Sequence, residues 1–238
     1  MKIIKNVYLY TKEDPKITQF HWAPIATIIE DLVKRYKKSK DVLEIGPGTV
    51  PFPLTTISIG VNETIKDYIS IDIDTTLFPF ENDTFDFMYC RHVLEDIQNP
   101  DFALAEIFRT AKHGFIETPS PLIEISKGVD ATSSNLQFNY CGYIHHRYII
   151  WSYKNVVYIL PKYPILEYLK ENKQLFSIAN NYPVYWNNYF LWDKTFPPEV
   201  VVYKNGVNME IRRDYVTLLE RAIYESMLNT NEFIEKIK

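Results

Sequence analysis

The stretch DVLEIGPGTVPFP, residues 41–53, decides the fold of this chain. A short apolar run that contains Glu44 ends at Gly46 and Gly48, which flank Pro47. The chain has only seven glycines, and two of them stand here. In an open parallel sheet the loop after the first strand must let the backbone approach a ligand closely, and glycine permits that approach. We therefore expect a buried strand followed by a ligand-binding loop.

Three classes of ligand compete for such a loop. A P-loop for nucleoside triphosphates requires GxxxxGK[ST], and the lysine is missing here. A dinucleotide fingerprint requires GxGxxG, but Pro51 stands where its third glycine belongs. S-adenosylmethionine carries a positive sulfonium and a free amino group instead of a diphosphate. An acidic residue at the strand end, here Glu44, suits that ligand electrostatically.

The composition is that of an ordinary soluble protein, with 46% hydrophobic and 24% charged residues. A net charge of −4 argues against a general nucleic-acid or anionic-membrane binder. No apolar run reaches the roughly 18 residues of a membrane span, and residues 1–16 are too polar for a signal peptide. Cys90 and Cys141 form neither a disulfide framework nor a CxxC pair. We expect a reducing, cytoplasmic location.

In the first half of the chain, short apolar runs alternate with helical patterns, which predicts a parallel sheet covered on both faces. The expected strands span residues 3–10, 41–45, 55–61, 68–74, 84–90 and 113–119. The expected helices span residues 17–38 and 99–112, the second capped by Asn99 or Asp101.

After about residue 120 the pattern changes. Residues 143–164 predict paired strands around a Lys-Asn turn, residues 183–192 and 199–206 predict later strands, and residues 212–237 predict a closing amphipathic helix. We expect a single domain over 1–238. Its parts are an N-terminal strand and helix (1–40), a ligand-binding core (41–122) and a substrate-side elaboration of the same sheet (123–238).

Two blocks, in this order, resemble class I S-adenosylmethionine-dependent methyltransferases. VLEIGPGTVPFP (42–53) resembles motif I, and residues 77–121 resemble the LPF…FD…HVLE…IETPSP block of one subgroup. The resemblance covers about residues 41–122, with weaker similarity through IHHRY (144–148) and LPKYP (160–164). It implies a Rossmann-like, doubly wound α/β fold. That fold has a mostly parallel seven-stranded sheet with helices on both faces, plus added antiparallel strands in the C-terminal half.

The resemblance also implies S-adenosyl-L-methionine as the cofactor and S-adenosyl-L-homocysteine as its product. The residues at the motif I positions, which would hold the methionine end, are Glu44, Gly46, Pro47 and Gly48. The acid that would bind adenine is Asp74 or, in the alternative register, Asp72, with Ile73 beside the ring.

Gly60 stands where the family has a ribose-binding acid, so Asn62 or Glu63 is expected to replace it. Cys90 and Arg91 are expected to line the cofactor pocket.

His92 matches the histidine of the family's HVLE block and is the first candidate for a general base, because imidazole titrates near neutral pH. The alternative is a histidine packed under a helix. Asp96, which replaces the last histidine of that block, and His146 complete the candidate catalytic set.

Glu117, His145 and Arg147 are candidate substrate-binding residues. Adjacent histidines on a strand point to opposite faces, so we expect only one of His145 and His146 to face the pocket and expect no metal there.

Imidazoles at positions 92 and 146 suit the deprotonation of a hydroxyl. We therefore expect O-methylation of a small-molecule or glycan acceptor, with no nucleic-acid partner and no membrane span. Two alternatives stay open: a non-catalytic protein that binds S-adenosylmethionine or acts as a scaffold, and an N-methyltransferase that acts on a small amine.

Overall fold

A computed structural model of the protein describes residues 27–36, 41–61, 65–130, 140–169, 172–203 and 212–237. The predicted strand at 3–10 lies outside these ranges, as do Asn62 and Glu63, the two candidate ribose-binding residues. Of the helix predicted over 17–38, the structure describes α2, Thr27–Tyr36.

The centre of the fold is a six-stranded sheet with strand order β3-β2-β1-β4-β5-β8. Its strands are β1 (Val42–Ile45), β2 (Ile57–Gly60), β3 (Tyr68–Ser70), β4 (Phe87–Arg91), β5 (His113–Pro119) and β8 (Asn187–Asp193). The first five are parallel, and β8 runs antiparallel to β5. All four residues of β1 are buried, as expected for a central strand that is covered on both faces.

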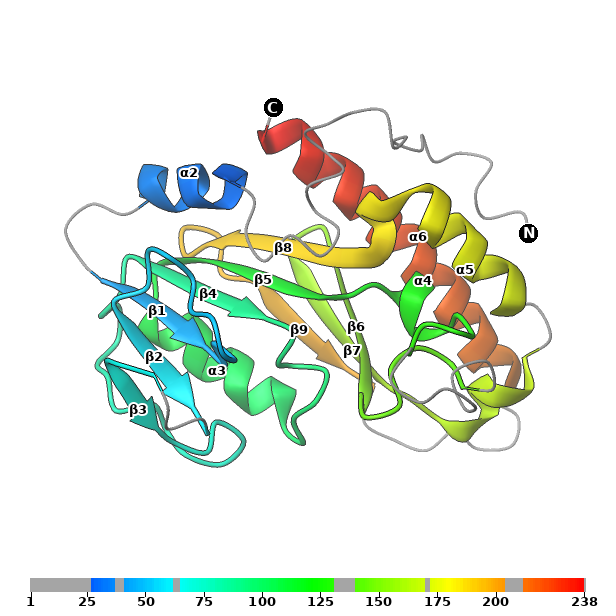
Figure 1. Ribbon diagram of the computed structural model, residues 1–238, viewed down its shortest axis with the longest axis horizontal. Helices are drawn as coiled ribbons and strands as arrows, with labels where there is room; N and C mark the ends of the chain where they lie inside the picture. Colours follow the sequence, from blue (N-terminus) through cyan, green and yellow to red (C-terminus); the bar gives the residue numbers. More distant parts are fainter. Residues whose placement is uncertain are drawn as a thin grey trace.

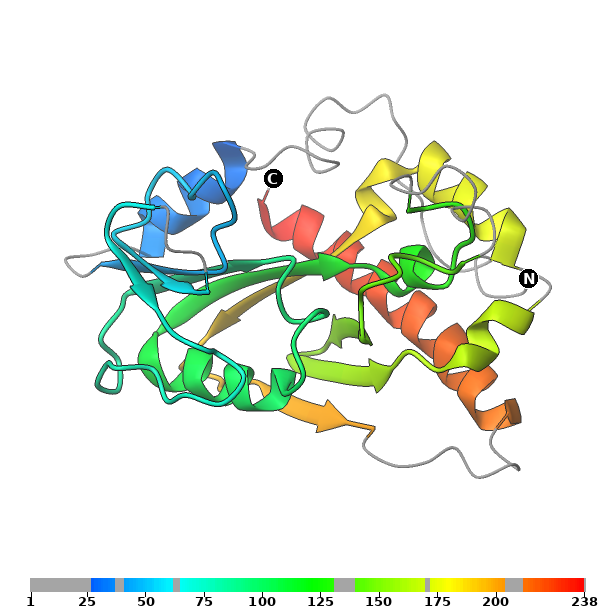
Figure 2. The ribbon, with the colours of Figure 1, turned by 60° about the horizontal axis from the view of Figure 1, so that its bottom comes forward.

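Helices cover both faces of this sheet. Neighbouring residues of a strand point to opposite faces, so Phe87 and Met88 of β4 enter different cores. Phe87 packs with residues of α2 and of the end of α6 (Arg212–Ile237), and Met88 packs with residues of α3 (Pro100–Thr110). Figure 2 shows α2 and α3 on opposite sides of the sheet. The doubly wound α/β arrangement predicted from the sequence is therefore confirmed.

The expectation of a seven-stranded sheet is corrected by the structure, because only β8 of the later strands joins the main sheet within the described residues. The others, β6 (Tyr148–Tyr153), β7 (Val156–Pro161) and β9 (Glu199–Val202), form a second, three-stranded sheet. Strand β8 pairs with β5 along its whole length, so that edge of the main sheet is already occupied.

The second sheet packs against the face of the main sheet that α3 also covers (Figure 1). Ile150, Val157 and Ile159 enter the core that Met88 shares with α3. On the opposite side of β6, Trp151 is fully buried and donates its indole N–H to Glu225 of α6 at 2.9 Å. The predicted Lys-Asn turn between β6 and β7 is confirmed by positive φ angles at Lys154 (49°) and Asn155 (62°).

The segment between β5 and β8 carries short elements besides the hairpin. They are α4 (Pro121–Glu124), η2 (Pro164–Tyr168), α5 (Asn172–Asn181) and η3 (Pro183–Trp186). None of the helices that the structure describes has the length and apolar character needed to cross a bilayer.

The parallel strands end on one side of the sheet, where the loops after β1, β3 and β4 meet. The amide of Gly46 donates to the carbonyl of Ile59 at 3.0 Å, which fixes the glycine loop beside the end of β2. The strand predicted over 68–74 is shorter than expected, because Asp72 to Asp74 already form a turn after β3.

Candidate active site

The glycine loop has a backbone that other residues adopt only with strain. Gly46 and Gly48 have φ angles of +63° and +58°. A Cβ atom on Gly46 would lie 2.4 Å from Cγ2 of Val93, whereas a Cβ on Gly48 would have no atom within 4 Å. Gly46 is therefore needed for packing against the loop after β4. At Gly48 the side on which a Cβ would stand instead faces open space.

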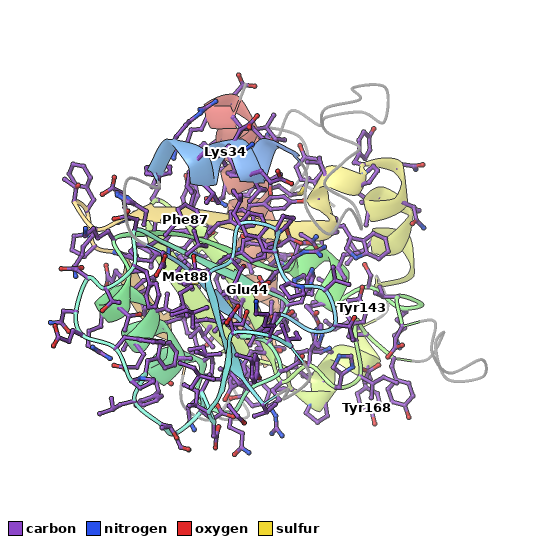
Figure 3. All side chains as sticks on the ribbon, turned by 60° about the vertical axis from the view of Figure 1, so that its left-hand side comes forward. Lys34, Glu44, Phe87, Met88, Tyr143 and Tyr168 are labelled. Atoms are coloured by element: carbon purple, nitrogen blue, oxygen red, sulfur yellow. The ribbon has the colours of Figure 1, made fainter. Side chains whose placement is uncertain are left out.

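Glu44, which precedes the glycine loop, binds the residues at the other end of that loop. Its side chain is buried, well inside the outline of the molecule (Figure 3). The carboxylate accepts hydrogen bonds from the Phe52 amide at 2.9 Å and from the Thr55 hydroxyl at 2.7 Å. Burial raises the pKa of Glu44 above its ordinary value, although the two hydrogen bonds oppose that effect. The loop from residue 46 to residue 55 is thus closed onto the acid that precedes it.

A cavity of about 250 Å³ lies above this loop. It is lined by Glu44, Gly46, Pro47, Gly48, Val50, Phe52, Tyr89, Arg91 and His92. The structure therefore brings together the four motif I residues with Arg91 and His92, two further predicted site residues at the end of β4. A buried carboxylate beside exposed loop backbone suits the amino and carboxyl groups of a bound methionine moiety.

Two aromatic residues of this cavity were missed from the sequence. The rings of Phe52 and Tyr89 stack at a centroid distance of 4.5 Å and an angle of 12°. Tyr89 lies in the predicted strand 84–90, but periodicity alone does not say which face of a doubly covered strand borders a cavity.

His92 sits between two carboxylates. Its Nε2 lies 3.1 Å from Oε1 of Glu117, and its Nδ1 lies 3.3 Å from Oε1 of Glu95. Burial lowers the pKa of His92, but the contacts with Glu117 and Glu95 outweigh burial and raise the pKa to about 9. At neutral pH the imidazole is therefore protonated. This state favours a role as a cationic hydrogen-bond donor over the predicted role as a general base.

Glu117 connects the ends of three strands. Its Oε1 accepts from Arg91 Nε at 2.7 Å, from Asn187 Nδ2 at 2.8 Å and from His92. Burial disfavours the charged carboxylate, but the hydrogen bond of His92 and the charge of Arg91 hold the pKa of Glu117 below its ordinary value. Glu117 thus orients two cavity residues, Arg91 and His92. Asn187 and Glu95 were not among the predicted site residues.

The side chain of Cys90 lies away from the cavity. It is fully buried in the core formed with α3, and burial raises the pKa of its thiol well above the ordinary value. Cys90 can therefore border a cofactor only through its backbone.

The candidate adenine-binding residues lie in the turn after β3. The carboxylate of Asp74 accepts from the amides of Gln98 at 2.8 Å and Asn99 at 2.7 Å. Asp72 accepts from the Asp74 amide at 2.9 Å, and Ile73 is buried in the core. Asp74 therefore acts as a cap of α3, since it accepts from the amide of Asn99 at the N-cap position. The side chain of Asn99 itself makes no cap bond.

Asp74 does not line the cavity at the glycine loop. It borders a second cavity of about 680 Å³, together with residues at the start of α3 and of the second sheet. Its role towards adenine stays a prediction.

The segment with His145, His146 and Arg147 docks against the loop after β4. The amide of Arg147 donates to the Glu95 carbonyl at 2.7 Å, and Arg147 Nε donates to the Asp96 carbonyl at 3.0 Å. The weak IHHRY similarity thus coincides with a segment that reaches the carboxyl end of the sheet.

The two histidines do not point to opposite faces, because His145 lies in a turn and strand β6 begins only at Tyr148. Their ring centroids are 4.5 Å apart, and both Nε2 atoms face Oδ1 of Asp96. The premise that both histidines lie on a strand is therefore wrong, and neither of them lines the two cavities described above.

Behind His146 stands a buried ion network. His146 Nδ1 lies 2.6 Å from Oε1 of Glu124, and Lys162 Nζ lies 2.8 Å from Oε2 of the same carboxylate. Lys162 also donates to the carbonyls of Cys141 and Tyr143. Burial disfavours the charged form of Glu124, but Lys162 and His146 hold its pKa below the ordinary value.

A family model described as "Methyltransferase domain" matches residues 20–156, more than half of the chain. A comparison with curated proteins finds no match.

Among solved structures, the chain is similar to a SAM-dependent methyltransferase from Thermotoga maritima, at 20% identity and a TM-score of 0.32. That similarity covers 40% of this chain and 53% of the other chain. A SAM-dependent methyltransferase from Aquifex aeolicus is 18% identical, with a TM-score of 0.31. That similarity covers 46% of this chain and 70% of the Aquifex chain.

Phosphoethanolamine N-methyltransferase 2 of Haemonchus contortus, in complex with S-adenosyl-L-methionine, is 17% identical, with a TM-score of 0.32. That similarity covers 50% of this chain and 31% of the Haemonchus chain. The chain spans about half the length of the Thermotoga structure.

Proposed function

Because this chain belongs to the family of S-adenosylmethionine-dependent methyltransferase domains, we propose that it transfers the cofactor's methyl group to a hydroxyl oxygen of a small-molecule or glycan acceptor. The family membership confirms the enzyme class and the cofactor that the sequence resemblance predicted. The observation that carries the proposal is the cavity in which a buried carboxylate, two glycines of positive φ and a protonated histidine meet.

The residues of the glycine loop would hold the methionine end of S-adenosylmethionine. The Glu44 carboxylate would provide negative charge close to the amino group, and at Gly48 the absence of a Cβ leaves room for the ligand. When bound, the cofactor supplies an electrophilic methyl group, and the protein has to align the acceptor with it.

An acceptor hydroxyl loses its proton during transfer, so a proton acceptor beside it is favourable. His92 is protonated and therefore suited to donate a hydrogen bond to an acceptor oxygen. Asp96 stands one turn further along the chain, and its amide donates to the Val93 carbonyl at 3.1 Å. Its carboxylate, with His146 beside it, is the group that we assign to receive the proton.

Aromatic side chains of the second cavity, namely Phe102, Tyr148 and Tyr203, support an acceptor with a ring. Tyr148 borders the second cavity and donates its hydroxyl to the Gln98 carbonyl at 2.8 Å. A sugar ring fits such an aromatic wall, because its C–H face packs on the ring while its hydroxyls remain free for hydrogen bonds.

The first test is calorimetric titration of the protein with S-adenosylhomocysteine. We expect Glu44→Gln to weaken binding by about tenfold to a hundredfold, because a charge-assisted hydrogen bond contributes about 1.5–3 kcal/mol. The matched control is Glu106→Gln, which changes a buried glutamate that pairs with Arg109 away from the cavity. Equal loss in both variants, or no binding by the folded wild type, would count against the cofactor assignment.

The second test is the acceptor class. The protein is incubated with S-adenosylmethionine and panels of nucleotide sugars, oligosaccharides and small amines, and the products are analysed by mass spectrometry. Methylated sugars or oligosaccharides support the proposal. Product only in the amine panel favours the N-methyltransferase alternative, and cofactor binding without any product favours the non-catalytic one.

A further inference from the structure

We infer that Asp96, His145 and His146 form a binding site for a divalent transition-metal ion, with Zn²⁺ as the best match. The ligand atoms of these three residues all lie within 4.8 Å of one another. No other group of this kind occurs among the residues that the structure describes. The inference rests on the positions of these three residues and not on the methyl-transfer proposal. Where a metal ion is bound, Asp96 acts as its ligand and not as the proton acceptor of that proposal.

The distances fit shared ligation better than hydrogen bonding. Oδ1 of Asp96 lies 3.7 Å from Nε2 of His145 and 3.6 Å from Nε2 of His146. A hydrogen bond would bring a nitrogen to within about 3.2 Å of the oxygen. Two ligands of one tetrahedral zinc ion, each at about 2.1 Å from the metal, lie roughly 3.4 Å apart. Both distances from Asp96 are therefore close to the spacing that a common metal ion imposes, and all three ligand atoms lie within 4.8 Å of one another.

Asp96 Oδ1 is a buried acceptor that lacks a hydrogen bond within the described part of the chain. Buried polar atoms are nearly always paired, so an unpaired carboxylate oxygen between two imidazoles requires a partner. A cation satisfies this oxygen and the lone pairs of both Nε2 atoms at the same time.

The support behind His146 is the arrangement that metal-binding histidines use. Its Nδ1 is hydrogen-bonded to Glu124 Oε1 at 2.6 Å, which places the proton on Nδ1 and directs the Nε2 lone pair towards Asp96. Glu124 is held in turn by Lys162, and a Cβ on Gly142 would lie 2.5 Å from its Oε2. This packed carboxylate–histidine pair orients the ligand before any metal binds.

The donor set and the exposure indicate the kind of metal. Two imidazole nitrogens and one carboxylate oxygen suit zinc and its first-row neighbours, whereas magnesium and calcium prefer oxygen ligands alone. The side chain of His146 is 5% exposed, but those of His145 and Asp96 are 65% and 41% exposed. A metal here is reachable from solvent and keeps a coordination position for water or for an oxygen of a small molecule.

The test uses full-length protein without a histidine tag, stripped with a chelator and dialysed. Co²⁺ is added while visible absorption is recorded, and Zn²⁺ is then used to displace it. We expect one equivalent of Co²⁺ to give ligand-field bands and Zn²⁺ to abolish them. No bands, or binding only at several equivalents, would overturn the site.

Substitutions then assign the ligands. His145→Ala and Asp96→Asn should each weaken Zn²⁺ binding at least tenfold, and His145→Ala should keep its fold because that side chain is exposed. The matched control is His113→Ala, since His113 pairs with Asp193 on other strands and should keep wild-type affinity. Wild-type affinity in His145→Ala, or an equal loss in His113→Ala, would refute the assignment. Because the readout is metal binding, a failed methyl-transfer assay leaves this result independent.

Discussion

Nε2 of His92 lies 3.1 Å from Oε1 of Glu117, and this contact joins the carboxyl ends of β4 and β5. His92 has a φ angle of +52°, and its amide donates to the Glu117 carbonyl at 2.9 Å. Backbone and side chain of the histidine are thus both tied to one residue of the next strand. We call this pair of contacts the His92–Glu117 clamp. It favours the charged forms of both side chains.

The clamp predicts a dependence of stability on pH. The pKa of His92 is raised to about 9 in the folded protein, against about 6.5 when unfolded. A raised pKa contributes stability that is fully present below pH 6.5 and is lost as the pH rises towards 9. About a third of the side chain is exposed, so solvent screening reduces the effect, and we expect a loss of about 1–2 kcal/mol in the free energy of unfolding.

The measurement is urea denaturation at pH 6, 7.5 and 9 in the presence of a chelator. His92→Asn, which tolerates a positive φ, should show a flatter profile than the wild type over this window. An equally steep decline in His92→Asn would assign the pH dependence to other groups.

The two loop glycines should respond differently to substitution by alanine. Both changes incur about 1–2 kcal/mol for a left-handed backbone at a residue with a Cβ. Gly46→Ala should be destabilised further, because its methyl group would clash with Val93. Gly48→Ala should lose little stability beyond the cost of its left-handed backbone. It should bind S-adenosylhomocysteine more weakly, because its methyl group enters the space that we assign to the cofactor.

Thermal denaturation and calorimetry separate the two cases. The double variant Gly46→Ala, Val93→Ala should recover part of the stability lost in Gly46→Ala, because it removes the atom that clashes. Additive losses in the double variant would show that the clash is not the cause.

Asp74 should act on the stability of α3. Asp74→Ala removes the acceptor of two amide protons and should lower the free energy of unfolding by about 1–2 kcal/mol. Asp74→Asn keeps a side-chain oxygen and should be closer to the wild type. Denaturation measures this role, and titration of Asp74→Asn with S-adenosylhomocysteine measures the predicted adenine contact separately.

Lys162 should be essential to the buried network behind His146. Lys162→Met leaves the fully buried Glu124 carboxylate without its main counter-charge, which costs about 3–5 kcal/mol. Adding Glu124→Gln removes the unpaired charge, so the double variant should be more stable than the sum of the single losses predicts. Strict additivity in a denaturant series would contradict this pairing.

Much of the fold follows from local patterns. The expected strands at 41–45, 55–61 and 113–119 each contain an observed strand, and the one at 84–90 overlaps β4. The helix at 99–112 and the Lys-Asn hairpin turn are also confirmed. Such elements are predictable because apolar runs, glycines and prolines act within a few residues of themselves.

The errors arise where distant segments compete. The antiparallel pairing of β8 with β5 links His113 with Asp193, and nothing local says that this strand and not the hairpin 148–161 takes the edge. The capping of α3 by Asp74 likewise joins residues 24 and 25 positions apart. A sequence pattern ranks Asn99 and Asp101 first because they are adjacent to the helix, but the folded chain supplies a better-placed oxygen.

By itself, the sequence determined the order of short buried strands and helices, the glycine loop with its preceding acid and, through its motif blocks, the family. The tertiary structure alone decided how the polar side chains meet. Glu117 joins Arg91, His92 and Asn187, and Asp96 faces His145 and His146, across separations that local pattern does not encode. The physical reason is that electrostatic contacts depend on distances in space, which the packing of the whole chain fixes.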